Sequence, residues 1–322
     1  MTDAKQLAET FLETFDKGGV DAFRAWLNSR PNTEKWIIGA DFALRDKSRP
    51  NDCFAFSIIP YEPESVDYRT LVERQLPKDI KHSRTLTSEG AALLRDAAAF
   101  HILVPINRDR VFFNAPDGQT EKDVARACLR LLLEQRTTLE RGPEAIKLTR
   151  QAIQKSKANA FNVGLFTDLT ILSILLPIIT LLIARERQPS VMGWFCDRDS
   201  MSGWCDGFLW GVALENLRGL GEHWSIASGP DPVIGLPDRS GPEEYMWFDH
   251  LIRLPDWLAG TLATWDRKVN FLPDGPDKYL RVVEDVLADA ENILILGIEM
   301  RRDVLNVSRT TISSAPETDG PL

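Results

Sequence analysis

One stretch of the chain constrains its fold more than any other. Residues 161–184 read FNVGLFTDLTILSILLPIITLLIA and are almost entirely apolar. A membrane-crossing helix needs about 20 mostly apolar residues, so length alone permits a span. Asp168 and Asn162 lie inside the stretch, however, and Pro177 lies near its middle. Because polar and charged side chains are costly in lipid, we predict a buried core helix and no membrane segment. The alternative is a membrane anchor with a basic flank at residues 185–187.

The composition is that of a folded protein with a sizeable core. The chain has 322 residues, of which 43% are hydrophobic and 26% are charged. This length favours one large domain with appendages over two independent domains. Lys and Arg number 38 against 47 Asp and Glu, which gives a net charge of -9. Such a balance excludes a protein that coats nucleic acid indiscriminately, although it allows a local basic groove.

The cysteines and the N-terminal sequence both indicate a cytoplasmic protein. The N-terminal segment alternates charged and apolar residues at helical spacing and has no continuous apolar run, so it does not resemble a signal peptide. The four cysteines form no CxxC pair, and we expect them to be reduced thiols rather than zinc ligands. They are Cys53, Cys128, Cys196 and Cys205.

The order of apolar patterns predicts an α/β fold with a mixed central sheet flanked by helices. We expect N-terminal accessory helices at residues 1–30, an α/β domain at 31–270, C-terminal helices at 271–307 and a disordered tail at 308–322. Residues 62–82 are expected to form a polar connection, and residues 225–246 a loop. The predicted strands are residues 36–44, 53–61, 100–106, 110–114 and 191–197. The predicted helices are residues 88–99, 121–138, 144–157, 165–184, 207–217, 254–265, 277–288 and 290–306.

A basic segment stands out against the acidic remainder. Residues 121–160 contain nine Lys or Arg and five Asp or Glu, so this part has a net charge of +4. Within it, Lys147, Arg150, Gln154 and Lys157 recur at steps of three and four along a predicted helix and therefore share one face. This face is a candidate for binding nucleic-acid phosphates. An ordinary solvated helix face is the structural alternative.

Several aspartates follow apolar stretches in positions where a bound cation would offset their charge. Asp41 follows the strand WIIGA, Asp197 and Asp199 follow the strand VMGWFC, and Asp256 lies at the start of a predicted helix. Unpaired charges in apolar surroundings are costly. Carboxylates are the hard oxygen ligands that Mg²⁺ and Mn²⁺ prefer. Each aspartate alone could instead cap a helix or form an ion pair.

Four short motifs carry a resemblance to a known family. They are IIGAD, DIKHSRTL at residues 79–86, MGWFCDRDS and IRLPDWLAGTLA. With them the chain resembles the domain-of-unknown-function 3800 family over residues 36–266. The resemblance implies a ribonuclease H-like fold in which Asp41, Asp197 and Asp256 bind the metal. It also implies that Asp199 replaces or assists Asp197, and that Lys81 lies near the site as part of the catalytic machinery.

The resemblance leaves two functions open. The first is a nuclease that hydrolyses phosphodiester bonds with Mg²⁺ or Mn²⁺ held by the aspartates. The family usually follows its first aspartate with Glu-Ser-Gly, whereas residues 42–44 here are Phe-Ala-Leu. The alternative is therefore a catalytically inert ribonuclease H-like subunit that binds nucleic acid or a protein partner. The sequence contains no GxSxG, GxxxxGK[ST] or GxGxxG motif, which disfavours a serine hydrolase or a phosphate-loop protein.

Overall fold

The computed structural model confirms the α/β class, with a seven-stranded mixed sheet flanked by helices. The chain divides into two compact units. Unit 1 comprises residues 1–13, 109–241 and 299–306, and unit 2 comprises residues 14–108, 242–298 and 307–322. The structure describes residues 4–62, 65–77, 80, 83–197, 200–235, 248–266 and 277–314.

The strands of unit 2 follow one another in the order β1, β2, β3, β6, β7. β1 is antiparallel to β2, and β2 is antiparallel to β3, whereas β3 and β6 are parallel. β2 and β3 are buried over almost their whole length, as expected for strands covered on both faces. The bounds are β1 Lys35–Ala43, β2 Asp52–Pro60, β3 Phe100–Ile106, β6 Ile293–Arg301 and β7 Val304–Thr310, the last two extending into unit 1.

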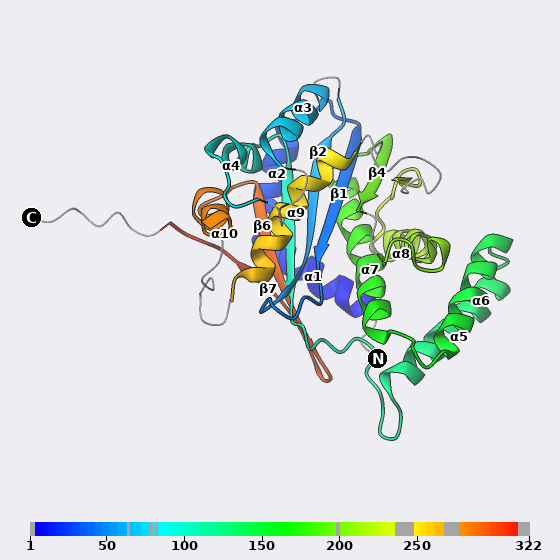
Figure 1. The fold of residues 1–322 in the computed structure, drawn as a ribbon. Helices are drawn as coiled ribbons and strands as arrows, with labels where there is room; N and C mark the ends of the chain where they lie inside the picture. The colour runs from blue at the N-terminus through cyan, green and yellow to red at the C-terminus, as the bar shows by residue number, and fades with distance from the viewer. Residues whose placement is uncertain are drawn as a thin grey trace, which may run out of the picture. The chain divides into compact units, whose positions relative to one another are not determined.

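The helices of unit 2 cover both faces of these strands, and Figure 1 shows α9 lying across β1 and β2. Helix α1 begins in unit 1 and ends in unit 2. The bounds are α1 Ala4–Gly18, α2 Val20–Asn28, α3 Ser65–Gln75, α4 Ser88–Arg95, α9 Asp249–Thr264 and α10 Asp277–Arg281, which continues into the π-helical turn η3 Val282–Leu287.

Alternation along the strands assigns each face to a helix. Trp36 packs against Trp26 of α2 at a ring separation of 5.5 Å, so the even-numbered residues of β1 face α2. Gly39 lies on the opposite face, where a Cβ would come within 3.3 Å of the backbone oxygen of Leu251 in α9. Odd-numbered residues of β1, including Asp41, therefore share the face that α9 covers.

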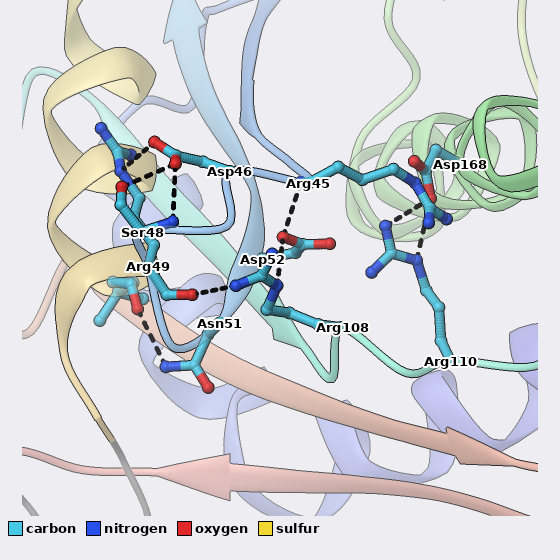
Figure 2. A network of polar contacts seen from close by, with 10 residues as sticks. Arg45, Asp46, Ser48, Arg49, Asn51, Asp52, Arg108, Arg110 and Asp168 are labelled. Carbon is cyan, nitrogen blue, oxygen red and sulfur yellow. Dashed lines mark hydrogen bonds and ion pairs between the residues drawn. The ribbon is translucent and has the colours of Figure 1, made fainter.

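The loop between β1 and β2 fixes the end of β1 to the end of α9. Asn51 donates from its backbone N–H to the carbonyl of Ala263 at 3.2 Å. Asp52 is the first residue of β2, and its buried carboxylate accepts a 2.7 Å hydrogen bond from the backbone N–H of Arg45 in the loop (Figure 2). Arg108 lies 4.0 Å from the same carboxylate and donates to the loop carbonyl of Arg49 at 2.5 Å. Because these contacts join three separate segments, the ends of β1 and α9 keep one relative position.

Unit 1 is mainly helical, and its strands β4 and β5 are parallel. Helix α5 begins with a capping box, in which the Thr120 side chain accepts from the backbone of Asp123 and the Asp123 carboxylate accepts from the Thr120 backbone. Helix α6 begins with Pro143 at its first position, where proline is favoured. The bounds are α5 Glu121–Thr138, α6 Pro143–Lys157, α7 Val163–Glu186, β4 Val191–Cys196, η2 Trp204–Asp206, α8 Phe208–Trp224 and β5 Val233–Gly235.

Helix α7 contains the apolar stretch and is buried, as predicted. It is the one described helix that is long and apolar enough to cross a membrane, and almost all of its most apolar part lies inside the protein. Its polar groups have protein partners. Asp168 accepts from the Arg110 Nε at 2.9 Å (Figure 2), and Thr180 accepts from the Trp194 indole at 2.8 Å. These contacts explain why a helix with such polar groups is stable in a protein core.

Two predicted elements are wrong. The prediction of a helix at residues 290–306 fails because ILILGIEMR forms β6, whose almost continuous burial arises from its parallel pairing with β3. An aliphatic run of this length does not distinguish a buried strand from a buried helix. Residues 110–114 form no strand.

Four further predictions need adjustment. Residues 308–310, predicted to belong to a disordered tail, complete β7. Residues 233–235, within the predicted loop at 225–246, form β5. Residues 62–82, predicted to be a polar connection, contain helix α3. Helix α9 begins at Asp249 rather than Leu254, so it contains Pro255, and Asp256 lies in its middle rather than at its start.

The Arg110–Asp168 pair provides a test of how α7 is stabilised. Both side chains are at most 2% exposed. Replacing one partner leaves an uncompensated buried charge, and we expect Asp168→Leu to lower the free energy of unfolding by about 3 to 5 kcal/mol in urea titrations. The double variant Arg110→Met/Asp168→Leu should recover most of that loss. If the double variant is no more stable than Asp168→Leu, the ion pair with Arg110 is not the means by which Asp168 stabilises the fold.

Candidate functional site

Asp41 occupies a half-buried position on β1, opposite Ala55 of β2. It shares its face of the sheet with Gly39, two residues earlier, where the backbone of α9 comes closest. The lack of a side chain at Gly39 lets α9 approach β1. As a result, Asp41 lies on the sheet face that α9 covers.

Asp256 extends from α9 to the segment that contains the predicted acid-Ile-Lys motif. Its carboxylate Oδ2 accepts a 3.3 Å hydrogen bond from the backbone N–H of Ile80, the middle residue of that motif. The Ile80 side chain reaches Gly260, where a Cβ would come within 3.1 Å of it. Two motifs separated by more than 170 positions therefore meet at α9. Lys81, the motif residue predicted to lie near the site, is outside the described residues.

Lys278 is a residue at this position that the sequence analysis did not single out. It is 2% exposed, and its ammonium group donates to the carbonyl of Ile80 and lies 5.1 Å from the centre of the Tyr279 ring. Asp256 thus binds the backbone N–H of Ile80, and Lys278 binds the backbone carbonyl of the same residue. No sequence signal identified Lys278, because one lysine in the segment DKYLR has the pattern of a solvated helix face.

Asp197 belongs to unit 1, whereas Asp41 and Asp256 belong to unit 2. It directly follows β4, as predicted, and is exposed; its backbone carbonyl accepts from the Ser202 hydroxyl at 3.2 Å. Asp199 lies outside the described residues. Among the residues that the structure describes, no group of three or more His, Cys, Asp or Glu side chains could hold a metal ion. We therefore derive no catalytic step through a metal.

Ser57 and His101 form a polar pair on the same sheet face as Asp41. They are opposite each other in β2 and β3, and the Ser57 Oγ lies 2.8 Å from His101 Nδ1. Both residues are completely buried, so no substrate reaches the hydroxyl. Burial lowers the pKa of His101 to about 4. The imidazole is therefore neutral at physiological pH and acts as a structural hydrogen-bond partner.

The basic face of unit 1 is held in place by a buried arginine. Arg136 of α5 donates to the Thr149 hydroxyl at 2.6 Å and to the Ala145 carbonyl at 3.0 Å, both on α6. It also pairs with Glu215 of α8 at 2.9 Å. Arg136 is 2% exposed, so these contacts replace its hydration and join α5, α6 and α8.

The outer side of α6 forms one wall of a groove with a volume of about 500 Å³. Two of the predicted phosphate-binding residues, Lys147 and Arg150, line it. Lys157, the third, is exposed at the end of α6 but does not line the groove. The residues that line it are Lys147, Arg150, Gln151, Gln154, Lys155, Cys205 and Asp206.

The second wall of the groove is the turn at η2. Cys205 and Asp206 have φ angles of 48° and 54°, and Gly207 follows with 88°. Left-handed conformations are unfavourable for Cys, so this turn is held against its local preference. Burial raises the pKa of the Cys205 thiol to about 11, and the thiol therefore stays protonated. The groove has cations on one wall and a neutral thiol beside a carboxylate on the other.

Comparisons of the chain with protein-family models, curated proteins and solved structures find no match. The resemblance to the domain-of-unknown-function 3800 family remains a prediction from its motifs.

The buried His101 predicts a specific pH dependence of stability. Its folded-state pKa of about 4 lies below its ordinary value of 6.5, so protonation favours the unfolded chain. The stabilisation that neutral His101 contributes to the folded protein should be complete above pH 6.5 and should be lost as the pH falls towards 4. We expect the stability difference between the parent and His101→Asn to narrow by about 3 kcal/mol over this range. His250 has a similarly lowered pKa but is present in both proteins. If urea titrations show a constant stability difference between the parent and His101→Asn from pH 7 to pH 4, the lowered pKa of His101 is contradicted.

Proposed function

We propose that this protein binds nucleic acid through the groove between α6 and the η2 turn. The observation that carries the proposal is that Lys147 and Arg150, selected from helical spacing alone, line one groove together with Lys155. On an otherwise acidic protein, a cluster of cations attracts a polyanion to one place, and the acidic remainder of the surface repels it.

Lys147 and Arg150 of α6 are exposed and therefore available to phosphate groups. Lys147 lies 3.1 Å from Glu144, but both side chains are more than 60% exposed. Such a surface pair contributes little, so a phosphate can replace the glutamate at small cost. Lys157 extends the basic face beyond the groove along the same helix.

The proposal includes the ribonuclease H-like fold and the cytoplasmic location. The antiparallel order β1, β2, β3 and the parallel pair β4, β5 support a sheet of that type, with the acids at or near strand ends. The four cysteines form no disulfide, which supports a reducing compartment.

The variant Lys147→Glu/Arg150→Glu/Lys157→Glu tests the proposal. We expect it to bind a labelled oligonucleotide at least tenfold more weakly than the parent. Because each cation that contacts phosphate releases counterions, the slope of log K against log salt should fall by about 2 to 3. Fluorescence anisotropy from 50 to 300 mM salt measures both quantities.

A matched control makes the same change in charge on other exposed cations of unit 1, in the variant Lys5→Glu/Arg130→Glu/Arg141→Glu. It should retain most of the affinity. Equal losses in the two variants would mean that net charge, rather than the groove, governs binding.

A second candidate function is phosphodiester hydrolysis. The observation that favours it is the contact between Asp256 and Ile80, which joins two motifs of the family resemblance on the sheet face that carries Asp41. The sequence predicts Mg²⁺ or Mn²⁺ as the cofactor. The described residues do not complete such a site, so this function needs its own test.

The variants Asp41→Asn and Asp256→Asn provide that test. If the acids act in hydrolysis, each should lower cleavage of a labelled oligonucleotide with Mg²⁺ or Mn²⁺ at least a hundredfold. Asp256→Asn can still accept from Ile80 through its amide oxygen, so the fold should be retained. Asp21→Asn, on the exposed side of α2, is the matched control. A parent protein that cleaves neither RNA nor DNA with either metal would eliminate this candidate.

A further inference from the structure

The two walls of the α6 groove carry opposite chemistry. Lys147, Arg150 and Lys155 belong to the α6 wall, whereas Cys205 and Asp206 form the opposite wall. An anionic ligand with no donors would be attracted to the first wall and repelled by the second. The groove therefore suits a ligand that has an anionic edge and, across from it, a neutral edge with hydrogen-bond donors.

The groove has a second feature that calls for donors. The side-chain oxygen of Gln151, on the α6 side, is buried and accepts no hydrogen bond from the residues that the structure describes. A buried acceptor without a donor is unfavourable and is usually satisfied by water or a ligand. Gln151 and Asp206 both line the groove, so each brings a side-chain acceptor to its lining.

The dimensions of the groove limit the ligand. A volume of about 500 Å³ is that of a small-molecule site. Lys147 and Lys155 are eight positions apart, or about 12 Å along the helix. A base that is still paired in a duplex cannot enter such a site without being separated from its partner.

We propose that this groove binds an unpaired nucleotide, with the phosphates on the α6 cations and the amino-bearing edge of the base on Asp206. The inference rests on the proposed function and specifies its substrate as single-stranded nucleic acid. Carboxylates accept hydrogen bonds from the exocyclic amine of cytosine. Thymine has a carbonyl oxygen at the same position, which the Asp206 carboxylate repels.

Oligo(dC) and oligo(dT) of equal length are a matched pair of probes, because they carry the same backbone charge. We expect the parent to bind oligo(dC) five- to tenfold more tightly than oligo(dT). It should bind a mixed-sequence single strand at least tenfold more tightly than the corresponding duplex at equal salt. Fluorescence anisotropy at a fixed salt concentration measures all four affinities.

The variant Asp206→Asn should remove the preference for cytosine. An amide has one donor and one acceptor and can bond to either base. Asn also tolerates the left-handed conformation at this position, so the turn should fold. The control Asp117→Asn changes an exposed carboxylate of unit 1 that does not line the groove, and it should retain the preference.

The possible results separate this inference from the proposed function. If the parent binds both oligonucleotides equally, or Asp206→Asn keeps the preference, the unpaired-base site is wrong while phosphate binding by α6 stands. Equal affinity for duplex and single strand leads to the same conclusion. Absence of salt-dependent binding to every probe would overturn both.

Discussion

The burial of α7 is the constraint on which unit 1 depends. A helix that is apolar on every side must be covered on every side, and α8 packs along it. Its side-chain polar groups are satisfied at the same time, by Arg110 at Asp168 and by Trp194 at Thr180. The position of α8 is set by this packing.

The packing of α8 on α7 also determines where the two walls of the groove lie. Helix α8 carries Glu215, the partner of Arg136, and Arg136 in turn holds α6 through Thr149 and Ala145. The η2 turn, which immediately precedes α8, supplies Cys205 and Asp206. Both walls of the groove are consequently attached to the helix that covers α7.

The sequence predicted the elements with a distinct period or composition. The strands around residues 36–44, 53–61 and 100–106 and the buried helix α7 are confirmed. Residues 290–306 were misassigned because an aliphatic run fits a helix or a strand until its neighbours are known. The neighbour here is β3, almost 200 positions away. The helix predicted at residues 254–265 begins earlier, at Asp249, and α9 continues through Pro255.

The candidate sites show the same limit of local patterns. Helical spacing placed Lys147 and Arg150 together because that relation is local. The wall formed by Cys205 and Asp206 comes from a segment about 50 positions later, and nothing in the local pattern relates it to α6. Lys278 and Ile80 meet for the same reason of tertiary packing. Asp256 and Ile80 likewise meet across more than 170 positions, a contact that spacing alone does not show.

The central claim is that nucleic acid contacts unit 1 at α6 and the η2 turn. Ultraviolet crosslinking of the full chain to a single-stranded oligonucleotide, followed by mass spectrometry of the peptides, locates that contact directly. The account predicts crosslinked peptides from residues 147–155 and 204–206, with competition by unlabelled single strand. Crosslinks confined to unit 2, or spread over the surface without preference, would contradict it.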